Sequence, residues 1–144
     1  VRGRREILGI SQRALAERSG VKQPLIAAIE RGRRVASTSA RAALEGALTI
    51  YPAEALEARR DQVFELFSAA GLAPPEVFGS VARGEAGHDS DIDFLVPFTD
   101  RHDILDLLEL EDALEELLTI PVSVVDERAI GPVIERAKAE AVPL

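Results

Sequence analysis

Two aspartates, Asp91 and Asp93, stand two positions apart in the chain. Ile92, Phe94 and Val96 alternate with them, and a period of two predicts a β-strand. The two carboxylates therefore project from one face, with their Cα atoms roughly 6.6 Å apart. Carboxylates this close repel each other unless a cation or a proton lies between them. Because Mg²⁺ usually binds one or two carboxylates together with substrate phosphates, the pair predicts a Mg²⁺ site.

Gly79 and Ser80 end a short apolar run that precedes these aspartates. A glycine lets the backbone approach a ligand closely. Exposed N–H groups and a hydroxyl donate hydrogen bonds to phosphate oxygens. The stretch from Gly79 to Asp93 therefore predicts a site that holds a metal ion and phosphates together.

The run GSVARGEAGHDSDIDFLV resembles the signature of the minimal nucleotidyltransferases of the DNA-polymerase-β superfamily. Their pattern is Gly-Ser, Arg-Gly, a short spacer, and Ser-Asp-x-Asp before a hydrophobic residue. The resemblance implies Mg²⁺ and ATP as cofactors. It makes Asp91 and Asp93 the catalytic, metal-holding pair, and Gly79, Ser80 and Arg83 the residues that bind the nucleotide's phosphates. The alternative is a turn before a strand with incidental acids.

The family's third carboxylate is absent from its expected place. Enzymes of the family carry it on a later strand, and in the aligned run PVSVV the residue there is Ser123. Asp126 lies three positions on, and an odd offset puts it on the opposite face unless the strand ends or bulges first. Three readings stay open: nucleotidyl transfer, nucleotide binding without turnover, and a fold kept for protein contacts.

The beginning of the chain reads as two short helices joined by a tight turn. Ser11 is an N-cap for the first helix, and Gly20 suits its C-terminal end. Pro24 fits only the first turn of the second helix, which Gly32 ends. Two such helices form a helix-turn-helix. The basic residues Arg2, Arg4 and Arg5 before it are either a DNA-contacting arm or a disordered end.

This stretch, ISQRALAERSGVKQPLIAAIERGRR, resembles the XRE/Cro-like repressor motif. The resemblance implies DNA binding, with Gln23 as the one bidentate reader of a base edge and further arginines on phosphates. The alternative is a helix-turn-helix used only for protein contacts. Carried over by position, the DNA-facing residues are Gln12, Lys22, Gln23, Pro24, Ala27, Ala28 and Arg33.

Charge divides the 144-residue chain. Residues 1–50 carry ten basic and four acidic residues, a net charge of +6, and residues 51–144 carry seven and 21, a net charge of −14. Such asymmetry indicates two units with different partners, of which the basic one suits nucleic acid. We expect a helix-turn-helix domain over 1–49 and a nucleotidyltransferase domain over 53–144. The lack of cysteine, of a signal peptide and of any apolar run of about 20 residues predicts a cytoplasmic protein without a membrane span.

The expected fold is an all-α helix-turn-helix domain followed by an α/β minimal nucleotidyltransferase domain with a three-stranded core sheet. Strands are expected at 76–78, 90–96 and 121–125. The helix that Asp100 or Asp103 caps runs to Leu118, and its many acids are interpreted as a solvated face. His88 and His102 are isolated and receive no catalytic assignment.

The two resemblances together imply an antitoxin-like regulator. Minimal nucleotidyltransferases are often paired with a HEPN-type toxin, onto whose tyrosine they transfer AMP. The hypothesis is a homodimer that binds a DNA operator and modifies a partner toxin. One alternative is a non-enzymatic regulator with a degenerate nucleotidyltransferase domain, which Ser123 favours. A weaker one is an enzyme that acts on a small molecule or RNA.

Overall fold

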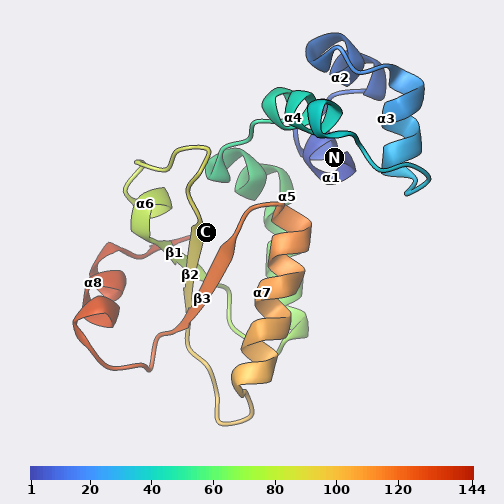
Figure 1. Cartoon of the computed structure of the whole chain (residues 1–144). Coiled ribbons are helices and arrows are strands. Elements are labelled where there is room, and N and C mark those ends of the chain that lie inside the picture. The colour runs from blue at the N-terminus through green and yellow to red at the C-terminus, as the bar shows by residue number, and fades with distance from the viewer. The chain divides into compact units, whose positions relative to one another are not determined.

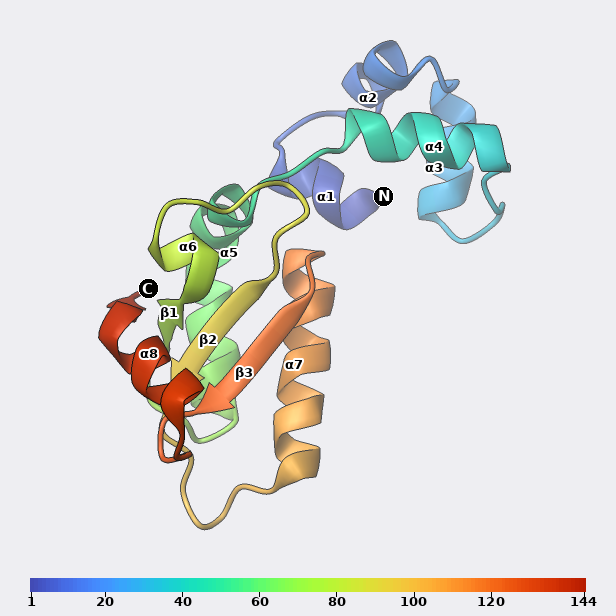
Figure 2. The ribbon, with the colours of Figure 1, turned by 60° about the vertical axis from the view of Figure 1, so that its left-hand side comes forward.

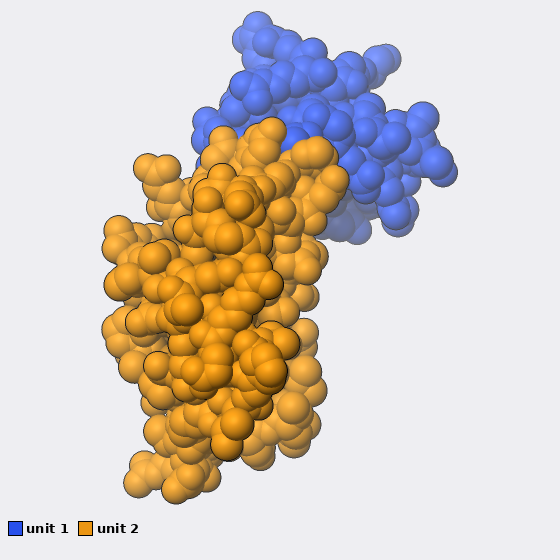
Figure 3. Space-filling view, turned by 90° about the vertical axis from the view of Figure 1, so that its left-hand side faces the viewer, with its two compact units in different colours: residues 1–50 blue, residues 51–144 orange.

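The computed structural model describes all residues, 1–144, and the chain divides into two compact units between Ile50 and Tyr51. Figure 3 colours the two units separately. None of the helices combines the length and the apolar character needed to cross a bilayer.

Four helices form the first unit (Figure 1). They are α1 (Arg2–Ile7), α2 (Gln12–Ser19), α3 (Gln23–Glu30) and α4 (Thr38–Ala47). The Ser11 hydroxyl caps α2 by accepting a hydrogen bond from the Ala14 N–H at 3.0 Å, and Gly20 ends the helix at φ 73°. That left-handed conformation costs glycine little, so the predicted turn is confirmed. The buried core of the unit consists of Leu15, Val21, Ile26, Leu44 and Leu48.

The arginine-rich beginning is a helix rather than an arm or a disordered end. In α1, Arg2 pairs with Glu6 one turn on, at 2.8 Å. Arg5 reaches the end of α3, where its guanidinium donates to both carboxylate oxygens of Glu30 at 2.7 and 3.1 Å. Only 4% of the Glu30 side chain is exposed. A bidentate ion pair of this kind holds the two side chains in one relative orientation, so it attaches α1 to α3.

The second unit is an α/β fold whose sheet has the order β3-β2-β1-β4. β1 is antiparallel to both β2 and β4, whereas β2 and β3 run parallel. Its elements are α5 (Pro52–Ala69), β1 (Glu76–Phe78), α6 (Gly79–Ala82), β2 (Ile92–Val96), α7 (Ile104–Leu118), β3 (Val122–Asp126), α8 (Pro132–Glu140) and β4 (Val142–Pro143).

Helices α5 and α7 cover one face of this sheet (Figures 1 and 2). Phe94 of β2 packs on that side against Phe67 of α5, edge to face, with ring centroids 5.4 Å apart. Side chains alternate along a strand, so Asp93 projects from the opposite face. The hydrophobic face of β2 therefore determines on which side the aspartate lies.

The structure adds elements that the sequence does not predict. The sheet has a fourth strand, β4, which pairs Val142 with Val77 of β1. The polar segment after β1 begins with the short helix α6. The last helix starts at Pro132, because the chain turns first, with the Ala129 N–H donating to the Asp126 carbonyl.

Two acids of α7 also bind the backbone of a neighbouring strand, although Glu115 is itself exposed. The carboxylate of Glu115 accepts a hydrogen bond from the Val122 N–H at 3.0 Å, and that of Glu111 accepts one from the Val124 N–H at 2.8 Å. Both bonds end on the backbone of β3, the outermost strand on its side of the sheet. The two glutamates stand one helical turn apart, which matches two residues of an extended strand.

Candidate active site and nucleic-acid interface

Gly79 brings the start of α6 against β2. Phe78, the last residue of β1, pairs with Asp93 in the antiparallel register. The chain then turns at Gly79 with φ 68°, and a Cβ added there would lie 2.5 Å from Asp93 Oδ2. A side chain at position 79 would have to displace the Asp93 carboxylate, so glycine suits this position both for its conformation and for its close contact. The predicted phosphate-binding turn and the predicted metal-binding aspartate are thus adjacent.

Asp91 and Asp93 form an electrostatically strained pair. Asp91 is exposed just before β2, and Asp93 is half-buried within it. Burial, then the charge of Asp91, raises the pKa of Asp93, and the charge of Arg83 only partly opposes this. A carboxylate in such surroundings is stabilised by a cation. The oxygen donors of the two carboxylates fit Mg²⁺, which would be held by Asp91 and Asp93 and completed by phosphate oxygens.

The loop between α6 and β2, whose course Figure 2 shows, contains a turn closed by Ser90. Ser90 Oγ accepts a hydrogen bond from the Gly87 N–H at 2.9 Å, and the Ser90 N–H donates to the Gly87 carbonyl at 3.0 Å. This turn sets where Asp91 enters the site. Ser80, in the first turn of α6, is half-buried beside it.

Arg83 already has acidic partners. Its Nε lies 2.9 Å from Glu85, and its Nη1 lies 3.0 Å from Glu140 at the end of α8. These pairs raise the pKa of Arg83, with the Glu85 hydrogen bond as the largest cause. To contact a nucleotide, the Arg83 guanidinium therefore has to release one of these carboxylates or bind the nucleotide alongside them. The sequence reasoning missed Glu140, because nothing local relates it to Arg83.

Ser123 lies next to Asp93. The parallel register pairs the two residues directly, so both side chains leave the same face of the sheet. No group of three or more His, Cys, Asp or Glu side chains comes together as a metal site. The position from which a third carboxylate would act is thus occupied by a hydroxyl.

Asp126 has a different task. β3 continues through it without a bulge, paired with Val96, so its side chain is on the other face. The carboxylate accepts hydrogen bonds from the N–H groups of Phe98 and Arg128, both at 3.0 Å. Burial acts to raise the pKa of Asp126, but the hydrogen bond from the Arg128 side chain and those backbone bonds lower it overall. Asp126 therefore links the residues that follow β2 and β3.

The two histidines lie outside this arrangement. His102 contacts the Ala70 carbonyl through Nε2 at 2.7 Å and accepts from the Thr99 N–H through Nδ1 at 3.1 Å, which attaches the loop before α7 to the end of α5. His88 lies edge-on to Tyr51 and 3.2 Å from Asp89. Neither is placed beside Asp93.

In the first unit, most of the expected DNA-facing residues are accessible. Lys22, Gln23, Pro24 and Arg33 are exposed, and Ala28 is half-buried. Ala27 is the exception: it is 9% exposed and belongs to the core, so its methyl group is not on the outer face of α3. The cause is helical geometry, because Ala27 follows the fully buried Ile26 on the inward side.

Gln12 joins α2 to α3 through a polar chain. Its Nε2 donates to Glu30 at 2.8 Å, and its Oε1 accepts from Gln23 Nε2 at 2.8 Å. Gln23 is thereby oriented before any contact with a base edge.

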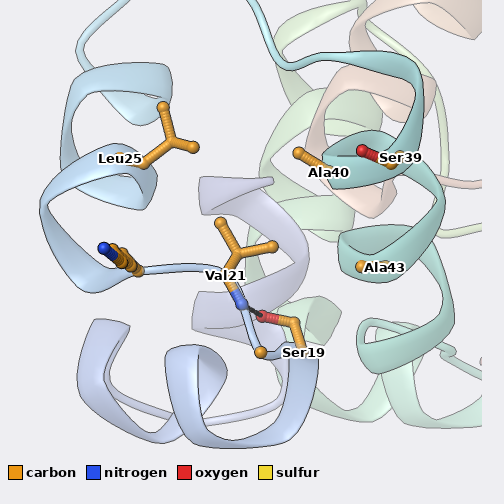
Figure 4. A pocket seen from close by; sticks show the side chains of 8 residues that line it. Ser19, Val21, Leu25, Ser39, Ala40 and Ala43 are labelled. Carbon is orange, nitrogen blue, oxygen red and sulfur yellow. Dashed lines mark hydrogen bonds between the residues drawn. The ribbon is translucent and has the colours of Figure 1, made fainter.

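A groove of about 320 Å³ lies between the turn before α3 and helix α4. Figure 4 shows Val21, Leu25 and Ala43 among the residues that line it.

We expect Glu30→Gln to destabilise the first unit by about 2 kcal/mol near pH 7, since it leaves the buried Arg5 without its countercharge. Burial acts to raise the pKa of Glu30, but hydrogen bonds from Arg5 and Gln12 lower it overall. When folding lowers the pKa of a carboxyl group, its ionised form stabilises the folded protein at pH values above the unfolded-state pKa. This stabilisation is lost as the pH falls through the folded-state pKa. The wild-type advantage should therefore shrink as the pH falls below the ordinary pKa of a glutamate, about 4.3.

Native-state hydrogen exchange of the Leu15, Ile26 and Leu44 amides measures this difference. Glu17→Gln is the matched control, because Glu17 forms an exposed pair with Arg13 at 3.4 Å and should change stability by only a few tenths of a kcal/mol. An advantage that stays constant throughout acid titration of the folded protein would contradict the assigned role of the charge.

The comparisons with known proteins find a matching family for each of the two units. Residues 73–143 match the family described as "Nucleotidyltransferase domain", and residues 1–54 match the family described as "Helix-turn-helix". Among similar proteins, the protein adenylyltransferase MntA of Thermococcus cleftensis is 43% identical over 49% of this chain and 68% of its own. A "Putative protein adenylyltransferase" of Methanocaldococcus jannaschii is 46% identical over 38% of this chain and 63% of its own.

Two solved structures are also similar. One, described as "Structure of putative minimal nucleotidyltransferase", is 47% identical, with a TM-score of 0.56 over 63% of this chain and 94% of the other. The second, "Crystal structure of the toxin-antitoxin with AMP-PNP", is 26% identical, with a TM-score of 0.52 over 58% of this chain and 69% of the other. The present chain belongs to the minimal nucleotidyltransferase family and carries a helix-turn-helix domain in front of that fold.

Proposed function

We propose that this protein is an antitoxin-like regulator whose second unit binds Mg-ATP and transfers AMP to a partner protein, a HEPN-type toxin. The observation that carries the proposal is the contact between Gly79 and Asp93, which joins a phosphate-binding turn to a strained carboxylate pair. The similarity to a protein adenylyltransferase and to a toxin–antitoxin structure supports it.

In this proposal each group has a defined task. Asp91 and Asp93 would hold the metal ion, which would supply the charge that neutralises the phosphates. The Ser80 hydroxyl and the N–H groups of α6 orient the phosphates, and Arg83 stabilises the pyrophosphate as it leaves. An acceptor hydroxyl forms the new bond to the α-phosphorus while the bond to the β-phosphate oxygen breaks, and the hydroxyl proton passes to solvent because Ser123 is no base.

A second candidate is favoured by the position of Ser123 beside Asp93. In this alternative the second unit binds a nucleotide without turnover, and the protein is a non-enzymatic regulator. Two carboxylates suffice to hold one metal ion, whereas a third commonly accepts the proton of the nucleophile or holds a second metal ion. We therefore expect that nucleotide binding can occur in this chain without the transfer reaction.

Transfer of label from α-labelled ATP with Mg²⁺ to the product of the neighbouring gene tests the first candidate. We expect label with the wild-type protein and a loss of at least about 100-fold in Asp91→Asn and Asp93→Asn, because each removes a charged metal ligand. Asp89→Asn is the control, since Asp89 is exposed in the same loop and pairs only with His88.

The outcomes separate the candidates. Label that depends on both aspartates supports the enzyme. Mg²⁺-dependent ATP binding without label supports the non-enzymatic regulator. Label that persists in Asp93→Asn would show that the site is misassigned.

The first unit, in our proposal, binds the operator of its own gene as a homodimer, with half-sites roughly 34 Å apart. DNA and ATP as ligands would place the protein in the cytoplasm. The exposed Lys22, Gln23 and Arg33 support this, because they combine one base reader with phosphate contacts.

We expect Arg33→Ala to weaken binding to all DNA sequences and to reduce the salt dependence of log K by about one unit, as one phosphate contact is lost. Gln23→Ala should instead reduce the preference for the operator over unrelated DNA. Fluorescence anisotropy at several salt concentrations measures both. Lys138→Ala, a charge-matched change in the second unit, serves as control, and equal losses in Lys138→Ala and Arg33→Ala would contradict the proposed interface.

A further inference from the structure

Glu140 joins the end of α8 to the phosphate-binding turn. Its carboxylate lies 3.0 Å from Arg83 Nη1 and 3.2 Å from Arg136 Nε, and only 20% of its side chain is exposed. Burial acts to raise the pKa of Glu140, but Arg136, Arg83 and, as the smallest contribution, the nearby backbone N–H of Gly79 lower it. One carboxylate therefore holds two of the groups that the proposed function assigns to the nucleotide, although it comes from a distant part of the chain.

Gly79 is consequently held on two sides. A Cβ at Gly79 would lie 2.5 Å from Asp93 Oδ2, and the Gly79 N–H lies near the Glu140 carboxylate. Directly after Glu140 the chain enters β4, where Val142 pairs with Val77 of β1. β1 leads into Gly79, so the strand before the turn and the carboxylate above it are fixed by the same C-terminal segment.

The charge of Glu140 acts against a nucleotide. A carboxylate that contacts Arg83 and lies near Gly79 stands beside the proposed phosphate site, and like charges at short range repel. Arg136 compensates part of this charge. Glu140 should thus weaken ground-state binding while it fixes the geometry needed in the transition state, and only the second effect raises the rate of the chemical step.

We propose that Glu140 is a positioning residue for the nucleotide's phosphates, which orients the Gly79 turn and Arg83 at the expense of nucleotide affinity. This inference rests on the proposed nucleotide-binding function of the same site. It gives the end of α8 a role in the reaction in addition to the roles of the Gly-Ser and Asp-x-Asp residues.

Steady-state kinetics of label transfer with Glu140→Gln test the inference. The glutamine keeps an acceptor for the Gly79 N–H and removes the charge. We expect the KM for ATP to fall about 3- to 10-fold and kcat to fall about 10-fold, because binding and positioning respond in opposite ways. Glu140→Ala, which loses the acceptor as well, should lower kcat further. Glu135→Gln, an exposed acid on the same helix, should match the wild-type protein.

A binding measurement keeps the test valid if turnover is absent. Titration with a non-hydrolysable ATP analogue and Mg²⁺ should give a Kd that is 3- to 10-fold lower in Glu140→Gln, that is, about 0.7–1.4 kcal/mol tighter binding. Hydrogen exchange at the Gly79 amide should accelerate in Glu140→Ala.

Failure of the inference and failure of the proposed function give different results. Wild-type binding that requires Asp91 and Asp93, with an unchanged Kd in Glu140→Gln, overturns the inference alone. A lower melting temperature with unchanged Kd, KM and kcat would make Glu140 purely structural and overturns it as well. A wild-type protein that binds no nucleotide overturns both.

Discussion

Ser123→Asp is expected to raise the rate of AMP transfer by about 100-fold, the lower end of what a positioned general base contributes. Ser123 pairs directly with Asp93 in the parallel register, so the new carboxylate would leave the same face as its neighbour. It could bind a second metal ion or accept the proton of the attacking hydroxyl. Transfer of α-labelled AMP under single-turnover conditions measures the change.

The same substitution should destabilise the protein when Mg²⁺ is absent. Burial and Asp91 already raise the pKa of Asp93, and a third carboxylate adds repulsion that a cation would relieve. Ser123→Asn, similar in size and uncharged, is the control and should change neither property. If Ser123→Asp binds Mg²⁺ more tightly and transfer still does not increase, the missing carboxylate is not what limits this site.

Gly79→Ala is expected to reduce transfer by about 100-fold, which is the order of loss that a 1 Å misplacement causes. The new methyl group would lie 2.5 Å from Asp93 Oδ2, so the carboxylate must move or the turn must open. The positive φ of 68° adds about 1–2 kcal/mol of backbone strain for a residue with a Cβ.

Gly84→Ala separates the clash from the strain. Gly84 has φ 69°, and nothing lies within 4 Å of a Cβ built on it. Both variants should lose similar stability in chemical denaturation, whereas only Gly79→Ala should lose transfer and Mg²⁺ binding. Equal activities in the two variants would mean that the Gly79–Asp93 contact has no part in the reaction.

Local patterns were sufficient for much of the architecture. The alternation around Asp93 predicted β2, and the caps Ser11, Gly20 and Asp103 predicted helix ends within a residue or two. These features depend on neighbours in the chain, so a single sequence contains them. The family resemblance added the pairing of Gly79 and Ser80 with the aspartates, which spacing alone does not establish.

Contacts between distant residues could not be predicted in this way. The pair Arg83–Glu140 spans 57 positions, and the pair Arg5–Glu30 spans 25. The strand β4 has only two residues, too few for a period to be recognised. Glu111 and Glu115 look like other acids on α7, and only the position of β3 shows that they have backbone partners.

Those two glutamates also affect how this protein meets copies of itself. An outermost strand with free N–H groups is a template on which another extended chain can pair, and such pairing leads to aggregation or strand exchange. On β3 the N–H groups of Val122 and Val124 are already bonded to Glu115 and Glu111. An incoming strand would have to displace the side chains of two glutamates, so this edge of the sheet is protected against growth.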